Sequence, residues 1–344
     1  MNSYAFWNNK GGVGKSFLCF VASTEYAHRY PDSDVYVIDL CPQGNVSETL
    51  LGGFDFEAKA INSLISGKRR KTVAGYLEER LNSPFRMVDE VEEYISHPNE
   101  FNKKIPENLW LVCGDNLLEL LSEAIRQTSQ LSIPTNAWSQ VILWVSDLTA
   151  ALRKRNSPRD AMFIIDCNPS FAIYTQLGLA AAQNVVVPFT GDDSSRRAIE
   201  NVIALLYGVG DQHTQTYARI SFAKRAVEEG LSQPKLHTFV SNRVTLYDGK
   251  PSKAFQVVSE RVKKTVDRIY EKHRGFYANP SQKPSEAFVQ VPDYHGAYIL
   301  SATTGTPLHR LTAGPKILDG ERIQINPEPL GRYRAALDAF VSRL

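Results

Sequence analysis

Residues 3–16 read SYAFWNNKGGVGKS, and this stretch decides the fold. Its first five residues are mostly apolar or aromatic, which predicts a short buried strand over 3–7. The glycine-rich loop KGGVGKS follows, and apolar residues at helical spacing then predict a helix to about Arg29. A second buried run, VYVID at 35–39, predicts the next strand. Strand, helix and strand in this order form a βαβ unit, which favours a parallel sheet.

The same alternation of strands and helices continues along the chain. A long helical pattern covers residues 137–155. Further buried runs have the length and composition of strands, and they lie at 109–113, 161–166, 184–189, 236–241 and 287–292. This order predicts the α/β class, with a doubly wound and mostly parallel sheet flanked by helices.

The loop after the first strand has the features of a phosphate-binding loop. Glycines let backbone N–H groups converge on phosphate oxygens, and the following helix adds the positive end of its dipole. In such a loop Lys15 reaches the β- and γ-phosphates, and the Ser16 hydroxyl ligates Mg²⁺. A chance glycine-rich turn is the alternative, and it does not account for the strand and helix on either side. The residues expected around the phosphates are Gly11, Gly12, Val13, Gly14, Lys15 and Ser16.

Two carboxylates follow strands that neighbour this loop in the predicted sheet. Asp39 ends the run 35–39, and Asp166 ends the run 161–166. Carboxylates at the carboxyl ends of parallel strands suit Mg²⁺, either directly or through its water molecules. The alternative is that either aspartate caps the helix that follows it.

One detail sets the loop apart from the usual phosphate-loop pattern. Asn9 stands where that pattern has its first glycine, and a second lysine, Lys10, precedes the glycines. In this respect the run KGGVGKS resembles the deviant Walker A motif of the ParA/MinD superfamily. Other segments resemble that superfamily as well: VYVIDLCPQGN its IDxDPQGN, NLWLVCGDNLLEL its NLxLIP, FIIDCNPS its IIDCPPS, and VVVPFTGDD the strand and loop after switch II. These segments begin at residues 35, 108, 163 and 185, and PQGN favours the ParA branch over the MinD branch.

The resemblance implies a P-loop ATPase that uses ATP and Mg²⁺ and forms an ATP-sandwich homodimer. Lys10 would act in trans on the partner's ATP and Lys15 in cis, so the implied catalytic set is Lys10, Lys15, Asp39 and Asp166. ParA-type members bind nonspecific DNA, work with a ParB-like or other adaptor protein, and partition or position DNA or a large cargo. These roles are implied by the resemblance and lie beyond what residue spacing can establish.

Two residues depart from the family pattern near the phosphates. The family has an acidic residue at the position of Cys41, where it helps to orient the attacking water, and a thiol is a weak donor and acceptor. Phe17 replaces a hydroxyl residue that meets the α-phosphate. We therefore expect slow hydrolysis, or else a nucleotide-dependent scaffold with negligible turnover. The segment 167–170, with Ser170, is expected to sense the γ-phosphate.

The adenine site is expected from two further segments. Asn242 and Arg243 follow the strand 236–241, where the family places a polar residue that contacts the base. Pro292 and Asp293 end a segment that resembles the family's later IP segment, which lies against the base. Ordinary loop chemistry is the alternative interpretation of all four residues.

The charge distribution decides whether a nucleic-acid partner is plausible. The chain carries a net charge of +2, which excludes a protein that is basic all over. Residues 75–125 nevertheless carry a net −7 and residues 219–274 a net +7. An amphipathic helix predicted at 253–273 has a basic face, and it is either a solvated surface or a DNA-binding stripe. The candidate DNA residues are Arg219, Lys224, Arg225, Lys250, Lys253, Arg261, Lys264, Arg268 and Lys272. The acidic stretch is a candidate surface for the adaptor or the dimer.

The 344 residues are interpreted as one enlarged domain, 1–344, and a hydrophobic fraction of 43% gives it a core. A divergent charged insert occupies about 54–106. The last helix, at about 331–344, either packs on the core or lies on anionic lipid as in MinD, and the PQGN segment disfavours the membrane. Four scattered cysteines without a CxxC pair fit a reducing cytoplasm, and DNA binding would make the protein nucleoid-associated.

Overall fold

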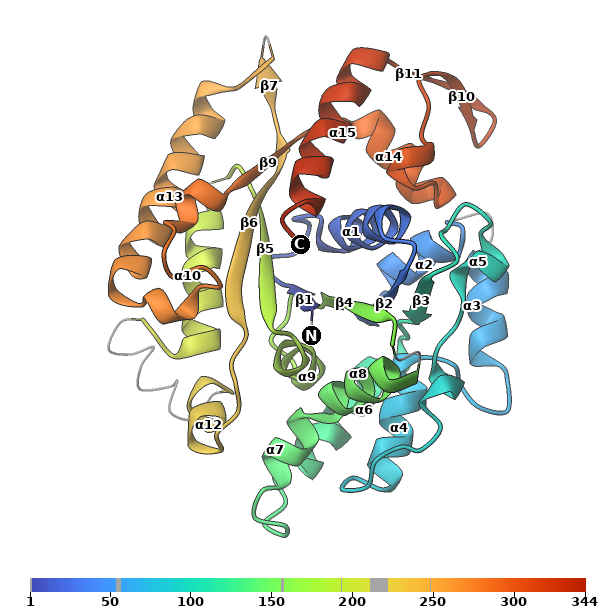
Figure 1. The fold of residues 1–344 in the computed structure, drawn as a ribbon, viewed down its shortest axis with the longest axis vertical. Coiled ribbons are helices and arrows are strands. Elements are labelled where there is room, and N and C mark those ends of the chain that lie inside the picture. The colour runs from blue at the N-terminus through green and yellow to red at the C-terminus, as the bar shows by residue number, and fades with distance from the viewer. Residues whose placement is uncertain (1, 54–56, 156–157, 193, 211–221, 248) are drawn as a thin grey trace.

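The computed structural model of the protein describes residues 2–53, 57–155, 158–192, 194–210, 222–247 and 249–344. Its centre is a seven-stranded parallel sheet with the strand order β3-β2-β4-β1-β5-β6-β9 (Figure 1). The strands are β1 (Asn2–Phe6), β2 (Ser33–Leu40), β3 (Leu109–Val112), β4 (Asp160–Cys167), β5 (Asn184–Thr190), β6 (Lys235–Val244) and β9 (Val289–Pro292). The predicted α/β class and parallel sheet are confirmed.

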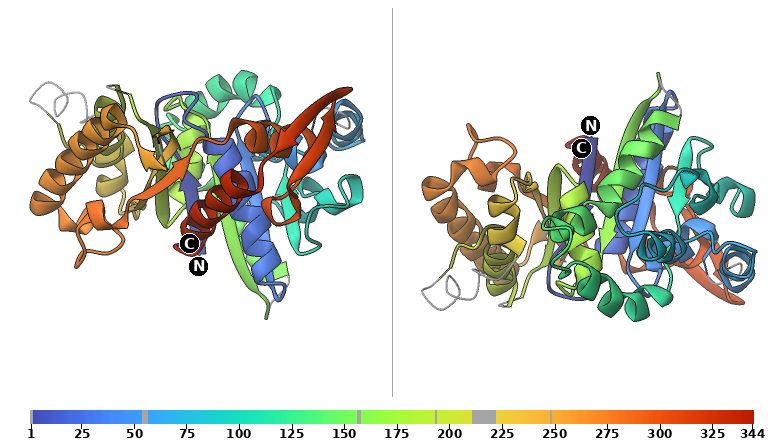
Figure 2. Two further views of the ribbon diagram at one scale, coloured as in Figure 1. Left: turned by 90° about the horizontal axis from the view of Figure 1, so that it is seen from above. Right: turned by 90° about the horizontal axis from the view of Figure 1, so that it is seen from below.

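Helices cover both faces of this sheet, which explains why its strands are apolar on both sides. One face carries α1 (Lys15–Arg29), α2 (Asn45–Leu51), α3 (Glu57–Ile65), α14 (His295–Thr304) and α15 (Pro327–Val341). The other carries α4 (Val73–Asn82), α6 (Leu117–Thr128), α7 (Ala137–Ile142), α8 (Trp144–Arg155) and α9 (Ile173–Ala181). Beside β5 and β6 lie α10 (Ser194–Tyr207), α12 (Phe222–Glu228) and α13 (Lys253–Lys272), as the two views of Figure 2 also show.

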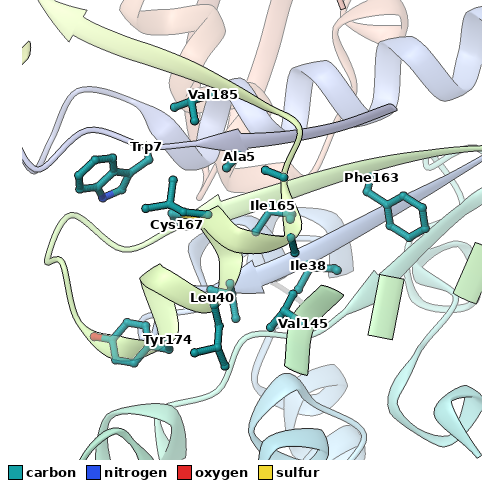
Figure 3. Packing of buried hydrophobic residues seen from close by; sticks show 14 of the residues in the cluster. Ala5, Trp7, Ile38, Leu40, Val145, Phe163, Ile165, Cys167, Tyr174 and Val185 are labelled. Atoms are coloured by element: carbon teal, nitrogen blue, oxygen red, sulfur yellow. The ribbon is translucent and has the colours of Figure 1, made fainter. Parts of the chain in front are cut away.

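Two hydrophobic clusters, one on each face of the sheet, form the core. Along β1 and at the residue that follows it, Tyr4 and Phe6 point into one cluster while Ala5 and Trp7 point into the other, as the alternation of a strand requires. Figure 3 shows the second cluster, in which residues of β1, β2 and β4 meet Tyr174 of α9 and other helical side chains. Burial on both faces therefore accounts for the continuous apolar runs in the sequence.

The sequence missed several smaller elements. The helical pattern at 137–155 forms two helices, because the helix is interrupted at Leu143 between α7 and α8. The insert contains α3, α4, α5 (Pro98–Phe101) and the 3₁₀ turn η1 (Val91–Tyr94). Two hairpins were not predicted, one formed by β7 (Leu246–Tyr247) and β8 (Lys250–Pro251) and one by β10 (Gly314–Leu318) and β11 (Glu321–Ile325). The remaining 3₁₀ turns are η2 (Arg274–Phe276), η3 (Pro284–Ala287) and η4 (Leu308–Arg310).

The last helix packs on the core of the domain. Helix α15 begins at Pro327, four residues before the predicted start, and runs alongside α1. Leu337 and Phe340 are fully buried, and the Tyr4 hydroxyl donates to the carbonyl oxygen of Leu344 at 2.6 Å. The apolar face that a membrane interpretation requires is therefore occupied by the protein's own core. Within the described residues, no helix is long and apolar enough to cross a bilayer.

Candidate functional site

The phosphate loop joins β1 to α1 at the carboxyl edge of the sheet. Gly12 and Gly14 have φ angles of 73° and 86°, a region that glycine enters without steric cost. Gly14 is the N-cap of α1, so the free N–H groups of the first helical turn face the loop. Lys15 is 6% exposed, and its Nζ donates to the carbonyl oxygens of Asn8 at 3.3 Å and Lys10 at 3.1 Å. The loop thus has the curvature and exposed donors that an anion requires.

The sheet register brings the two aspartates side by side. Asp39 on β2 pairs directly with Asp166 on β4, and Phe6 at the end of β1 pairs with Asp166 on its other side. Asp39 is fully buried, and its carboxylate accepts hydrogen bonds from the Ser47 hydroxyl at 2.7 Å and from the Cys41 backbone N–H at 3.0 Å. Burial raises the pKa of Asp39 to about 6, and these hydrogen bonds oppose the rise.

Asp166 lies in a different environment. It is fully buried, and among the described residues neither carboxylate oxygen has a hydrogen-bond partner of good geometry. Burial, followed by the charge of Asp39, raises the pKa of Asp166 to about 7, while the nearby Ser16 hydroxyl and Lys15 ammonium lower it. A buried carboxylate without partners is costly, so this position is suited to a bound cation.

Lys10 points away from the loop and toward the end of β5. Its Nζ forms an ion pair with Asp192 and donates to the Thr190 hydroxyl at 3.2 Å. Asp192 also accepts hydrogen bonds from the backbone N–H and the hydroxyl of Ser194, at the start of α10. The lysine is therefore held by its own subunit in this structure.

Residues 167–170 at the end of β4, called the switch segment below after the family segment that they resemble, contact Cys41 and α9. The Asn168 side chain lies 3.9 Å from Cys41 Sγ through its Nδ2 and accepts the Ser170 N–H at 2.9 Å through its Oδ1. Ser170 Oγ lies 3.4 Å from the Tyr174 hydroxyl, which donates to Glu119 of α6 at 2.9 Å. Burial raises the pKa of Cys41 to about 12, so the thiol stays neutral at physiological pH.

A cavity of about 560 Å³ opens beside the loop. This volume lies in the range of small-molecule sites. Its lining residues come from the loop and α1, from α2 and the segment before it, from the switch segment, and from β6 and α14. They are Gly12, Gly14, Lys15, Ser16, Phe17, Cys41, Asn45, Glu48, Thr49, Gly53, Cys167, Pro169, Arg243, Tyr298, Ile299, Ala302 and Thr303.

The expected adenine residues are only partly brought together. Arg243 lines the cavity. Asn242 lies against the loop, where its Nδ2 donates to the Val13 carbonyl oxygen at 3.0 Å. Pro292 and Asp293 are not in the cavity lining, because they end β9 where it pairs with β6 and the Asp293 N–H donates to Val244.

Helix α14 forms that wall of the cavity instead, and the sequence interpretation did not include it. Tyr298, Ile299, Ala302 and Thr303 form one face of this helix, while Leu300 and the residues beside it pack into the core. A helix that starts directly after the last strand of a parallel sheet lies at the edge where ligands bind, and this position is the signal that would have found it.

Two of the candidate DNA residues form ion pairs with acids on or just after their own helix, and one, Arg219, lies outside the described residues. Lys224 and Arg225 on α12 pair with Glu228 at 3.1 Å and Glu229 at 3.5 Å, and the Arg225 guanidinium also lies over a tryptophan ring. These two residues are therefore weaker candidates for phosphate contacts than the sequence implied.

Helix α13 has the predicted amphipathic arrangement. Phe255, Val262 and Val266 are buried on one face. Four basic residues at intervals of three and four share an exposed side of this helix; they are Arg261, Lys264, Arg268 and Lys272. Two more exposed lysines lie at or just before its N-terminal end, Lys253 and Lys250. Arg268 also pairs with an acid, Glu200 of α10 at 3.5 Å, as Lys224 and Arg225 do, and it is the most exposed of these three basic residues.

A comparison with protein-family models shows to which family the chain belongs. Residues 1–219 match a family model described as an AAA domain, which covers more than half of the chain. The matched region contains the two-lysine loop and both buried aspartates. The chain belongs to the ParA/MinD superfamily. It is therefore a P-loop nucleotide-binding protein, and the resemblance stated from the sequence is confirmed.

Several solved structures have the same fold. McdA of Cyanothece without nucleotide has a TM-score of 0.60 at 14% sequence identity, over 98% of this chain and 99% of that chain. The ATP complex of a Cyanothece McdA variant has a TM-score of 0.62 at 12% identity, over 99% and 96% of the two chains. A plasmid partition protein from Borrelia burgdorferi has a TM-score of 0.53 at 14% identity, over 100% and 99%. A search of curated protein sequences finds no match.

Proposed function

We propose that the protein is a ParA-type ATP-dependent switch. It binds ATP with Mg²⁺, forms an ATP-sandwich homodimer, binds nonspecific DNA, and positions DNA or a large cargo together with an adaptor protein. The observation that carries the proposal is a cavity lined by Lys15 and Ser16 of the phosphate loop, next to which two buried aspartates pair at the ends of β2 and β4. The similar fold of a McdA variant solved with ATP supports the choice of nucleotide.

The residues present fit a Mg²⁺ ion bound together with the nucleotide. Within the part of the chain that the structure describes, the two buried oxygens of Asp166 have no hydrogen-bond partner of good geometry, and Ser16 lies close enough to lower the pKa of Asp166. Within the described residues, no group of three or more His, Cys, Asp and Glu side chains could hold a metal alone. Asp166 and Ser16 would therefore hold the ion with phosphate oxygens and water, and Asp39 would act through a water molecule. Mg²⁺ would neutralise charge on the phosphates.

Other residues of this chain contact the phosphates and orient the aspartate. Lys15 compensates the β- and γ-phosphate charge within its own subunit, because it is buried beside Asp166 and already lies across the loop. Lys10 does the same for the partner's nucleotide once it leaves Asp192. Ser47 fixes the orientation of Asp39. The neutral Cys41 thiol is a poor acceptor for a water proton, so hydrolysis is slow.

Nucleotide binding tests the proposal first. Replacing Lys15 with Ala is expected to weaken ATP binding by about a hundredfold, because a buried charge-assisted contact to phosphate is lost. Replacing the exposed Lys68 with Ala is the matched control and leaves the affinity unchanged. Isothermal titration calorimetry with ATP and Mg²⁺ measures both. Equal affinities for the two variants would refute phosphate binding at this loop.

DNA binding is tested on α13. Replacing Lys264, Arg268 and Lys272 with Ala removes three exposed positive charges, so the slope of log affinity against log salt falls by about 2 to 3. The paired residues Lys224 and Arg225, replaced together by Ala, are the control and change the slope by less than about 1. Binding that does not depend on ATP, or that does not fall with salt, contradicts this part of the proposal.

A second function is favoured by Cys41, namely an assembly scaffold that binds nucleotide without useful turnover. Phosphate release by the wild type and by Cys41→Asp separates the two functions. The ATPase switch predicts slow turnover in the wild type, stimulated by an adaptor, and faster turnover in the variant. A wild type that turns over as fast as Cys41→Asp contradicts the role given to Cys41. A wild type with no turnover in any condition supports the scaffold.

A further inference from the structure

The insert at 54–106 meets the end of β3 at a buried carboxylate, that of Asp115. Asp115 follows the last residue of β3 by three positions, and its side chain is fully buried. The Arg70 guanidinium forms an ion pair with this carboxylate, and Arg70 Nη2 donates to its Oδ1 at 2.8 Å. The Thr72 hydroxyl donates to its Oδ2 at 2.7 Å, and the Leu117 N–H donates to Oδ1 at 2.9 Å. Hydrogen bonds to both oxygens fix the carboxylate in one orientation.

Gly114, the residue before Asp115, lies against the Asp39 carboxylate. A Cβ added to Gly114 would lie 2.7 Å from Oδ2 of Asp39 and 3.0 Å from the carbonyl oxygen of Cys41. The Gly114 N–H donates to the Ser47 hydroxyl at 2.8 Å, and that hydroxyl donates to Asp39 Oδ2 at 2.7 Å. Gly114 therefore supports Asp39 in two ways, by direct packing and by orienting the hydroxyl that binds the carboxylate.

The backbone of the insert is joined to β3 at the same place. The Val73 N–H donates to the Cys113 carbonyl oxygen at 2.8 Å, and Thr72 forms an isolated parallel bridge with Cys113. A Cβ added to Gly75 would lie 2.0 Å from the carbonyl oxygen of Arg70, so the first turn of α4 packs directly on this residue. Arg70 and the start of α4 thus have a fixed position relative to the end of β3.

We propose that Arg70 and Asp115 are positioning residues for Asp39, and that through Asp39 they set the affinity of the nucleotide site for Mg²⁺. They act by holding Gly114 and Ser47 in place. This inference rests on the proposed function, since it assumes that Asp39 acts on the ion through a water molecule. Among the described residues, the cavity lining includes neither Arg70 nor Asp115, so their effect on the ion is indirect. The divergent insert then has a role at the aspartates as well as at the surface.

Arg70→Gln and Arg70→Lys test the inference in the full-length chain, with Arg80→Gln as the matched control. Arg80 also belongs to the insert and pairs with Asp147 at 2.8 Å, a pair as buried as that of Arg70, and neither residue is in the cavity lining of the described chain. Calorimetry measures the affinity for ATP with Mg²⁺ and with EDTA in its place. Denaturant titration measures the free energy of unfolding of each variant.

The expected result is a change in the gain in ATP affinity that Mg²⁺ provides. Groups that hold metal-binding side chains change metal affinity by about tenfold to a hundredfold when they are replaced. Arg70 lies further from the ion than such groups, so Arg70→Gln is expected to lower the gain by about tenfold and to leave the affinity in EDTA unchanged. Arg70→Lys keeps the charge without the two-pronged contact and lowers the gain by about threefold. Arg80→Gln loses stability and keeps the full gain.

The comparison of the two arginines separates positioning from a general loss of stability. If Arg70→Gln and Arg80→Gln lower the gain alike, or if neither lowers it, the inference is overturned. If Arg70→Gln does not fold, Arg70→Lys decides, and an unchanged gain in that variant overturns the inference. A wild type whose ATP affinity does not depend on Mg²⁺ overturns the metal role in the proposed function, and this inference with it. A wild type that gains affinity from Mg²⁺ while both Arg70 variants gain as much overturns this inference alone.

Discussion

Replacing Asp192 with Asn tests whether the subunit restrains its own Lys10. In the structure, Lys10 forms an ion pair with Asp192 and contacts Thr190, whereas the proposed sandwich requires it on the partner's nucleotide. Although partial burial acts in the opposite direction, hydrogen bonds from Lys10, Ser194 and Thr190 hold the pKa of Asp192 well below its usual range. The carboxylate is therefore charged at every pH where the protein would work, and the restraint is present throughout.

The magnitude follows from the exposure of the two side chains. Lys10 is 27% exposed and Asp192 is 47% exposed, so solvent screens the pair and it contributes about 1 kcal/mol. That value corresponds to about fivefold in an equilibrium constant. A twofold dimer must open two such contacts, so the substitution is expected to tighten ATP-dependent dimerisation by about thirtyfold. Asn also remains a good cap for the start of α10, which preserves the fold.

Sedimentation velocity with ATP and Mg²⁺ over a range of protein concentrations measures this change. Asp89→Asn is the matched control, because Asp89 and its partner Arg86 are 76% and 77% exposed and lie outside the site. The control dimerises as the wild type does, whereas Asp192→Asn dimerises at lower concentration. If all three proteins dimerise alike, Lys10 is not restrained by Asp192. If Asp192→Asn dimerises more weakly, the carboxylate belongs to the dimer interface, and the reasoning is wrong.

Three further substitutions have expected outcomes that the structure fixes. Gly114→Ala would place a Cβ 2.7 Å from the Asp39 carboxylate. We expect this substitution to lower the free energy of unfolding by about 1 to 3 kcal/mol, measured by denaturant titration, and to weaken ATP–Mg²⁺ binding, measured by calorimetry. Unchanged binding contradicts the role of Asp39. Gly331→Ala lies in α15 with nothing within 4 Å of the new Cβ, so it is expected to stabilise the protein by about 0.5 to 1 kcal/mol, and a loss of stability in the same titration contradicts this. Burial, and then the charge of Arg343, lower the pKa of His237, so the stability from its neutral form is full above about pH 7 and is lost as the pH falls below 6.5 toward the folded value. His237→Asn should therefore lose less thermal stability than the wild type between pH 7.5 and 5.5, and parallel losses would refute this.

Most of the central sheet was predictable because its strands carry the signal themselves. The runs at 35–39, 161–166 and 184–189 are apolar at all but one terminal position each, and β2, β4 and β5 are buried on both faces. The structure places Lys15 and Ser16 at the start of α1 and the two aspartates side by side at the ends of β2 and β4, and the roles given to these residues stay predictions. The break at Leu143 was not predictable, because the apolar pattern continues across it.

The wall of the cavity that α14 forms depends on contacts that leave little trace in the sequence. Helix α14 carries no recognisable motif, and it lines the cavity because Gly53 and Gly305 allow its backbone to approach α2. The hairpin of β10 and β11 precedes α15, which packs back on α1. Pro292 resembled the right segment, yet β9 ends at the sheet edge before reaching the cavity. These positions follow from tertiary packing and not from local pattern.

Each residue that departs from the family pattern near the phosphates contacts a second residue that the family pattern does not predict. Cys41 stands in place of an acid, and its Sγ lies 3.9 Å from the Nδ2 of Asn168, which itself stands where the family segment has a proline. Phe17 stands in place of a hydroxyl residue, and its ring meets Tyr298. Residues in contact do not contribute independently, so single reversions to the family residue leave a mismatched neighbour. Cys41→Asp alone puts a third carboxylate beside Asp39 and Asp166, and its effect on turnover should depend on whether Asn168 is present to donate to it.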